Sequence, residues 1–212
     1  FPVTILRAIQ DITMQVLRPT WYQKWLGHRY LRPEEYGGIV DLTERNHRCE
    51  GYHDLLPDTL LESDALERTA DKQGNYLLTS AAPEGSPTHP SYPAGHATIA
   101  GACGTVLKTF LDEDARIEDP QRATADGKLE AAEPDSLRVG DEINKLMLNN
   151  ALGRDFGGFH YRFNGIGGIE MGETYAIGYI ADLLSEFDAE PLGPLSFTSV
   201  SGQEIEIRPS VT

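Results

Sequence analysis

Four prolines, at positions 83, 87, 90 and 93, divide the chain into two parts. Each proline fixes its backbone φ angle and lacks an N–H donor, so this segment is expected to be neither a helix nor a central strand. It ends in Ala94-Gly95-His96, and apolar residues then recur at helical spacing from Ala97 to Leu111. The sequence therefore predicts a rigid coil that delivers Gly95 and His96 to the start of a helix.

The start of this predicted helix has the properties of an anion-binding site. The first N–H groups of a helix have no acceptor within the helix, and Gly95 allows a ligand to approach the backbone closely. Downstream, Arg154 and His160 flank Gly157-Gly158. Two residues six apart do not share a helical face, but a helix that ends at the glycines lets both side chains face one cavity. Together the two segments predict a site for a tetrahedral oxyanion, with a Pro-rich loop and packed histidines as the alternative interpretation.

Composition limits the class of protein and the kinds of partner. The chain has 212 residues, of which 40% are hydrophobic, and this length suits one sizeable core, so residues 1–212 are expected to form a single domain. The net charge of −15 argues against nucleic acid as a partner. The sequence contains no run of about 18 apolar residues, so it predicts no membrane span. Residues 1–33 nevertheless carry a net charge of +4. Lys24 and Arg32 are spaced to face one side, which favours an anion pocket over a solvated helix face.

Hydrophobic periodicity predicts a mainly α protein, a helical bundle with a small β-hairpin at the C-terminus. Residues 112–133 are expected to form an exposed connection, residues 34–80 to be rich in loops, and about 193–210 to form the hairpin tail. Helices are expected at 1–17 with a stop at Pro19, at 21–31, 57–70, 97–111 and 134–154, and after a Gly-rich turn at Asn164 to Gly168.

Three motifs, in this order, resemble those of the vanadium-dependent haloperoxidases. They are Lys24-x₇-Arg32-Pro33, the run from Pro90 to His96, and the run from Gly153 to Arg162. The resemblance extends over nearly the whole chain and is closest to the bromoperoxidases of red algae and cyanobacteria. The type 2 phosphatidic acid phosphatase superfamily shares the same signature. The resemblance implies a helical bundle of the haloperoxidase and acid phosphatase type, acting as one catalytic domain.

The resemblance also implies a role for each motif residue. His160 would be the axial vanadium ligand, while Lys24, Arg32, Arg154 and the Gly95 N–H would bind vanadate oxygens. His96 would transfer protons, because the pKa of histidine lies near neutral pH, and would contact the cofactor as well. His89 matches a position that is histidine in bromide-oxidising members. The catalytic set is therefore His96, His160, Lys24 and His89, the cofactor is vanadate, and phosphate is expected to be able to occupy the same site.

The implied reaction is the oxidation of bromide by hydrogen peroxide to a hypobromous acid equivalent that halogenates organic acceptors. The residues alone are also compatible with two other functions. The first is phosphomonoester hydrolysis in the same pocket, with His160 as the nucleophile. The second is a non-catalytic fragment that binds an oxyanion or takes part in assembly.

Three differences from the family pattern bear on these expectations. Ala94 replaces a serine whose hydroxyl donates to vanadate, a kind of hydrogen bond worth about 1.5–3 kcal/mol. Asn164 replaces an aspartate, so it can orient His160 without adding charge. Algal members are also much longer. We therefore expect either a homo-oligomer or association with a missing N-terminal half.

Overall fold

The computed structural model describes residues 2–46, 50–54, 56–133, 137–186 and 194–210. They form a helical bundle with two short antiparallel hairpins, which confirms the predicted mainly α class and the C-terminal hairpin. The helices are α1 (Pro2–Tyr22), the π-helix η1 (Gln23–His28), α2 (Pro33–Asn46), α3 (Glu50–His53), α4 (Asp58–Leu61), α5 (Asp64–Gln73), α6 (Gly95–Phe110), α7 (Val139–Phe156) and α8 (Arg162–Ser185). The strands are β1 (Gln121–Ala123), β2 (Leu129–Ala131), β3 (Leu195–Thr198) and β4 (Glu204–Ile207).

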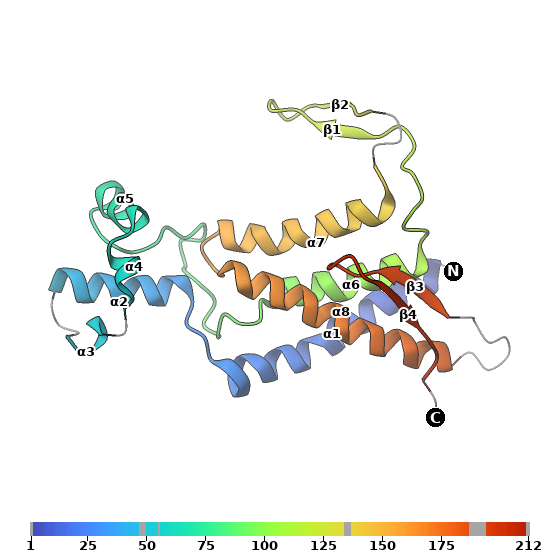
Figure 1. The fold of residues 1–212 in the computed structure, drawn as a ribbon, viewed down its shortest axis with the longest axis horizontal. Helices are drawn as coiled ribbons and strands as arrows, with labels where there is room; N and C mark the ends of the chain where they lie inside the picture. The colour runs from blue at the N-terminus through green and yellow to red at the C-terminus, as the bar shows by residue number, and fades with distance from the viewer. Residues whose placement is uncertain (1, 47–49, 55, 134–136, 187–193, 211–212) are drawn as a thin grey trace.

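Helix α6 lies at the centre of the bundle and packs against α1, α7 and α8 (Figure 1). The β3–β4 hairpin covers one end of this core, with Leu195 opposite Ile207 and Phe197 opposite Ile205. No helix among the described residues has the length and apolar character needed to cross a membrane. The main core consists of buried side chains from five elements, namely Ala8, Ile12, Val16, Ala102, Val106, Ala176, Ile180, Leu184, Phe197 and Ile207.

Helices α6 and α8 touch backbone to backbone. A Cβ added at Gly101 would lie 2.4 Å from the carbonyl oxygen of Ile169, and one added at Gly172 would lie 2.1 Å from that of Thr98. Both distances are far below van der Waals contact, so only glycine fits at this crossing. Because α6 begins at Gly95, the α6–α8 contact also fixes the position of the residues at its N-terminus.

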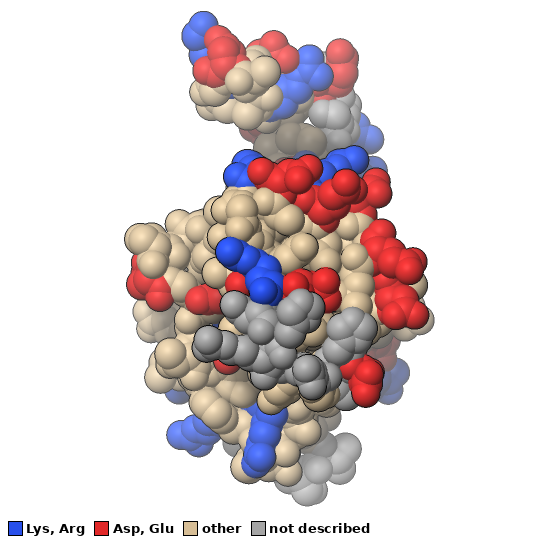
Figure 2. Space-filling view, turned by 90° about the vertical axis from the view of Figure 1, so that its left-hand side faces the viewer, with Lys and Arg blue, Asp and Glu red and all other residues tan. Residues whose placement is uncertain are grey.

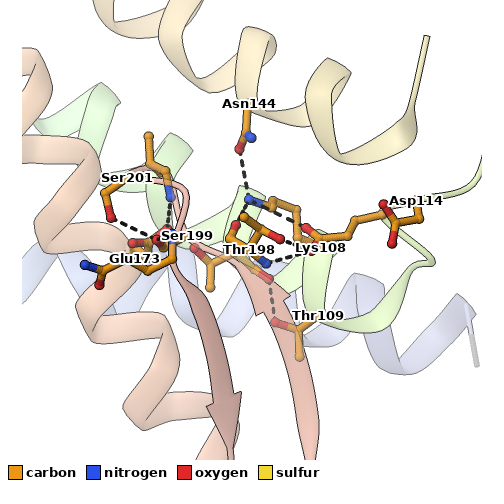
Figure 3. Close-up of polar contacts among 12 residues, drawn as sticks. Lys108, Thr109, Asp114, Asn144, Glu173, Thr198, Ser199 and Ser201 are labelled. Atoms are coloured by element: carbon orange, nitrogen blue, oxygen red, sulfur yellow. Dashed lines mark hydrogen bonds and ion pairs between the residues drawn. The ribbon is translucent and has the colours of Figure 1, made fainter. Parts of the chain in front are cut away.

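The buried cation Lys108 fastens the C-terminal hairpin to the bundle (Figure 3). Its Nζ donates to Asn144 Oδ1 of α7 at 3.0 Å and to the carbonyl oxygen of Thr198 in β3. Glu113 Oε2 lies 3.8 Å from the same nitrogen. A charge at this depth requires such partners, since an unpaired ammonium would be costly to bury. One side chain thus connects α6, α7 and β3.

Two helix boundaries differ from the prediction because packing overrides local signals. Pro19 was expected to end the first helix, yet α1 continues through it to residue 22. Ile12, Val16 and Thr20 are all buried on one face, and Thr20 Oγ1 donates to the carbonyl oxygen of Val16 at 2.7 Å. These contacts compensate for the backbone hydrogen bond that Pro19 cannot donate.

The Gly-rich segment Asn164 to Gly168 was predicted to be a turn, but it lies inside α8. Its glycines serve close packing instead of chain reversal. A Cβ at Gly165 would lie 3.1 Å from the Ala151 Cβ of α7, and one at Gly168 would lie 2.8 Å from the carbonyl oxygen of Ala94. The prediction of a turn from these glycines was therefore wrong.

The expectation for residues 34–80 was also incomplete, because α2 occupies 33–46. Its start carried a recognisable signal, with Pro33 at the first position and Glu34 and Glu35 in the first turn. Residues 112–133 are a connection as expected but contain the β1–β2 hairpin. The predicted helix start at 134–136 lies outside the described residues, and α7 begins at Val139.

The α6–α8 contact leads to a stability prediction. Replacement of Gly172 by alanine is expected to lower the free energy of unfolding by about 1–3 kcal/mol, because the added methyl overlaps the α6 backbone. Gly178→Ala in the same helix is the matched control, since a Cβ there meets nothing within 4 Å. That variant should be neutral or stabilised by up to about 1 kcal/mol through helix propensity. Chemical denaturation measures both, and equal stability of the two variants would contradict the close contact.

Candidate active site

A cavity of about 160 Å³ lies where η1, the Pro-rich coil, the N-terminus of α6 and the α7–α8 turn meet. All the residues predicted to form a site line it, namely Lys24, Arg32, His89, Gly95, His96, Arg154 and His160. The sequence did not predict the other residues that line the cavity, which are Leu17, Thr20, Trp21, Pro87 and Ile99. A signal for two of them existed, because Trp21 precedes Lys24 by three residues and Ile99 follows His96 by three, the spacing of one helix face.

Lys24 is buried at the bottom of the cavity, with 1% of its surface exposed. It belongs to η1, a π-helical segment of the kind that often occurs at functional sites. Its Nζ donates to the carbonyl oxygen of Pro90 at 2.7 Å and to that of Ser91 at 3.3 Å. Burial, and then repulsion from Arg32, lower the pKa of Lys24 to about 7. Both hydrogen-bond partners of Lys24 are neutral carbonyls, so they do not neutralise the ammonium charge.

The Arg32 guanidinium connects the Pro-rich coil to the α7–α8 turn. Nε donates to the carbonyl oxygen of His89 at 2.8 Å, and Nη1 donates to that of Phe159 at 2.8 Å. The Arg32 backbone N–H donates to Glu35 Oε2 at 2.8 Å, which fixes the chain at the start of α2. Burial, followed by repulsion from Arg154, lowers the pKa of Arg32 to about 10. Arg32 thus holds the two histidine-bearing segments together.

The tautomer of His160 follows from its two neighbours. Asn164 Oδ1 accepts the Tyr161 backbone N–H at 3.0 Å, so the amide oxygen is turned toward His160 Nδ1, 3.3 Å away. Nδ1 must then carry the proton, and Nε2 accepts a hydrogen bond from Arg32 Nη1 at 3.3 Å. Burial, and then the charge of Arg32, lower the pKa of His160 to about 3. The imidazole is therefore neutral and offers a lone pair.

His89 has the opposite tautomer. Arg32 Nη2 lies 3.1 Å from His89 Nδ1, and a guanidinium can only donate. The Pro90 carbonyl is also near Nδ1, but at the longer distance of 3.3 Å, so we let Nδ1 accept from Arg32 and place the His89 proton on Nε2. The Trp21 ring contacts His89 edge-on at 4.8 Å between centroids. Burial, and then Lys24, lower the pKa of His89 to about 4, which keeps this donor neutral.

Arg154 and His96 complete the polar lining. The Arg154 guanidinium lies 4.4 Å from the centre of the Phe159 ring, and its buried Nε has no hydrogen-bond partner among the described residues. Burial lowers the pKa of Arg154. His96 occupies the first turn of α6, and burial, then Arg154 and Lys24, lower its pKa. Arg154 and His96 both line the cavity, and His96 is biased toward its neutral form.

The charge of the cavity fits a multiply charged oxyanion. Three cationic side chains line it, and the described lining contains no aspartate or glutamate. Burial lowers the pKa of all three, and repulsion from a neighbouring cation lowers the pKa of Lys24 and Arg32 further, so an anion would stabilise the charged forms. Arg154, whose Nε has no partner among the described residues, and the first N–H of α6 are available as donors, and His160 Nε2 is a neutral nitrogen that could bind a metal in place of its contact with Arg32. Vanadate therefore fits this set of residues.

Comparisons with known proteins agree with this geometry. A family model described as the VCPO second helical-bundle domain matches residues 59–186, a range that includes His89, Gly95, His96, Arg154 and His160. A vanadium-dependent bromoperoxidase of Ascophyllum nodosum is 40% identical over 199 residues, which are 90% of this chain and 35% of that protein. One from Corallina officinalis is 32% identical over 197 residues, 84% of this chain and 33% of that protein.

The solved structures include a similar fold. The homohexameric structure of the second vanadate-dependent bromoperoxidase of Ascophyllum nodosum superposes with a TM-score of 0.85 at 29% identity, over 98% of this chain and 40% of that one. The chain thus spans about a third of the length of the curated relatives it matches. Because the family model covers more than half of the chain, the chain belongs to the vanadium haloperoxidase helical-bundle family.

Proposed function

We propose that this chain binds vanadate in the cavity and oxidises bromide with hydrogen peroxide, giving a hypobromous acid equivalent that halogenates organic acceptors. The observation that carries the proposal is the set of three cations, with Lys24 and Arg32 buried and Arg154 half-buried, that lines one cavity with the neutral imidazole of His160. The names of the relatives, at 40% and 32% identity, support the choice of vanadium and bromide.

Each residue of the lining has a task in this proposal. His160 Nε2 would bind vanadium, while Lys24, Arg32, Arg154 and the Gly95 N–H would bind the oxygens. When bound, vanadate supplies a Lewis acid that polarises peroxide toward attack by halide. Phosphate is also a tetrahedral oxyanion, so it is expected to compete for the same donors.

The two other histidines act on protons and on the halide. His96 would take the proton that hydrogen peroxide loses on entering the site and return it to the departing oxygen, because its lowered pKa keeps the imidazole ready to accept. His89 would offer its Nε2–H to the incoming bromide as a neutral donor. The apolar wall formed by Leu17, Trp21 and Ile99 limits the water around these groups.

Self-association is the second part of the proposal. The fold neighbour from Ascophyllum nodosum is homohexameric, and this chain matches 40% of its length. We expect the present chain to associate with copies of itself as well. The cavity, at about 160 Å³, is suited to small ions and peroxide.

The activity has a direct test. Bromide oxidation by hydrogen peroxide should rise to saturation as vanadate is added to protein stripped of oxyanions, and His160→Ala should reduce it to background because the lone pair is lost. His28→Ala is the control, since His28 is exposed and contacts Tyr30 and Tyr92 outside the cavity. Turnover indifferent to vanadate, or retained in His160→Ala, would contradict the proposal, and hydrolysis of an aryl phosphate would point to the phosphatase reaction instead.

Oxyanion binding should depend on pH through Lys24. Because its pKa is about 7 in the empty cavity, Lys24 must take up a proton for an anion to bind above that pH. Sulfate affinity should therefore be level below about pH 7 and fall above it, approaching about tenfold per pH unit. His89 and His160 are already neutral in this range and add no slope.

Sulfate is the appropriate probe because it stays a dianion throughout this range. Titration calorimetry in two buffers with different ionisation enthalpies measures both the affinity and the protons taken up. Lys24→Met should bind more weakly at low pH and lose the slope. Proton uptake that persists in Lys24→Met would assign the effect to another group.

A further inference from the structure

Trp21 differs in its chemistry from the other residues that line the cavity. It contributes to the lining and is also 42% exposed, so its ring can be reached both from the cavity and from solvent. Among the described residues, no tyrosine, methionine or cysteine contributes to this lining. Indole is the most electron-rich of the aromatic side chains, as its strong attraction for cations shows. An electrophilic oxidant formed in the cavity therefore meets one readily oxidised side chain there.

The indole lies next to the residue to which we assign the halide. The ring centroids of Trp21 and His89 are 4.8 Å apart, with an interplanar angle of 63°. Arg32 Nη2 lies 3.1 Å from His89 Nδ1 and holds the imidazole in place. Bromide that accepts the His89 Nε2–H would be oxidised beside the indole. The product of that oxidation would thus meet Trp21 before it reaches solvent.

The charge distribution of the molecule favours reaction inside the cavity over reaction at the surface. The chain has a net charge of −15, and Figure 2 shows acidic side chains gathered in several patches on one face. The cavity has the opposite charge, because Lys24, Arg32 and Arg154 line it. Hypobromous acid ionises to an anion, which the cavity attracts and an acidic surface repels. The oxidant is therefore expected to stay longer near Trp21 than near side chains on the surface.

The second tryptophan of the chain provides an internal comparison. Trp25 belongs to η1 and is 46% exposed, nearly the same fraction as Trp21. Unlike Trp21, it does not contribute to the lining of the cavity. An oxidant that acts from solution should therefore reach both indoles alike, whereas an oxidant formed in the cavity should reach Trp21 first.

We propose that Trp21 is a site of oxidative self-modification, at which hypobromous acid formed in the cavity converts the indole to an oxindole. The C2–C3 double bond of the indole gives an electron pair to bromine, and the O–Br bond breaks to release hydroxide. Water then adds at C2, and one of its protons neutralises the hydroxide. Loss of bromide from C3 with a proton from C2 leaves the oxindole. The ring gains one oxygen atom and loses two electrons, which bromine takes up on becoming bromide.

The inference rests on the proposed bromide oxidation and specifies which side chain the product of that reaction attacks. Peptide mass spectrometry after turnover tests it. The full chain, loaded with vanadate, receives bromide, hydrogen peroxide and a phenol whose bromination records turnover. Trypsin cleaves after Lys24, so Trp21 and Trp25 fall in different peptides. Trp21 should gain oxygen at least about tenfold faster than Trp25, because proximity raises the effective concentration of the oxidant.

Three controls separate the cavity from solution as the source of the oxidant. Reagent hypobromous acid, added without peroxide, should oxidise Trp21 and Trp25 to similar extents, as their exposure predicts. His160→Ala, given peroxide and bromide, should leave both indoles intact. A higher concentration of the phenol, which intercepts oxidant in solution, should suppress oxidation of Trp25 before that of Trp21. In Trp25→Phe, the oxidation of Trp21 should proceed as in the wild type.

The outcomes distinguish this inference from the proposed function. Bromination of the phenol with Trp21 intact, or with Trp21 and Trp25 oxidised equally, would overturn the inference and leave the proposed function standing. The inference would also be overturned if reagent hypobromous acid favoured Trp21 as strongly as turnover does, because the preference would then belong to the residue and not to the cavity. Absence of any bromination would contradict the proposed function, and this inference with it.

Discussion

The cavity depends on the enclosure of three cations without a carboxylate beside them. Lys24, Arg32 and Arg154 repel one another, and burial deprives them of water, as their lowered pKa values reflect. Backbone carbonyls of residues 89–91 and Phe159 partly offset this cost by accepting from Lys24 and Arg32. Because those carbonyls belong to the two segments that carry the histidines, the same bonds hold the charges and set the shape of the site.

The bundle supplies the rigidity that this arrangement requires. Gly101 and Gly172 let α6 and α8 meet at their backbones, and the Ala94 N–H donates to the carbonyl oxygen of Asn164 at 3.0 Å. The N-terminus of α6 and the first turn of α8 are therefore fixed against each other, and with them His96 and His160. The glycines between α6 and α8 therefore matter for the site, because a wider spacing of these helices would separate His96 from His160.

The sequence was informative about the site and less so about the elements that build it. Lysine, arginine and histidine residues between glycines and prolines form a recognisable pattern, so the sequence alone predicts the polar residues of the cavity. The carbonyls that bind Lys24 and Arg32 carry no sequence signal, because every residue has one. Helix α1 continues through Pro19 and α8 includes Gly165 because of tertiary contacts. Helix propensity describes only the local sequence and cannot predict such contacts. The β1–β2 hairpin has short strands with weak alternation, so the sequence predicts only a connection there.

The replacement of aspartate by Asn164 is consistent with the electrostatics of the cavity. An aspartate would add a negative charge next to Nδ1 and favour the imidazolium form of His160. The amide fixes the same tautomer by hydrogen bonding alone, and burial, followed by the charge of Arg32, lowers the pKa of His160 to about 3. The cations attract an oxyanion, and burial together with the charge of Arg32 keeps His160 neutral. Ala94 packs in a small apolar cluster with Ala97 and Met147, so the oxyanion would rely on the Gly95 N–H at that end of the cavity.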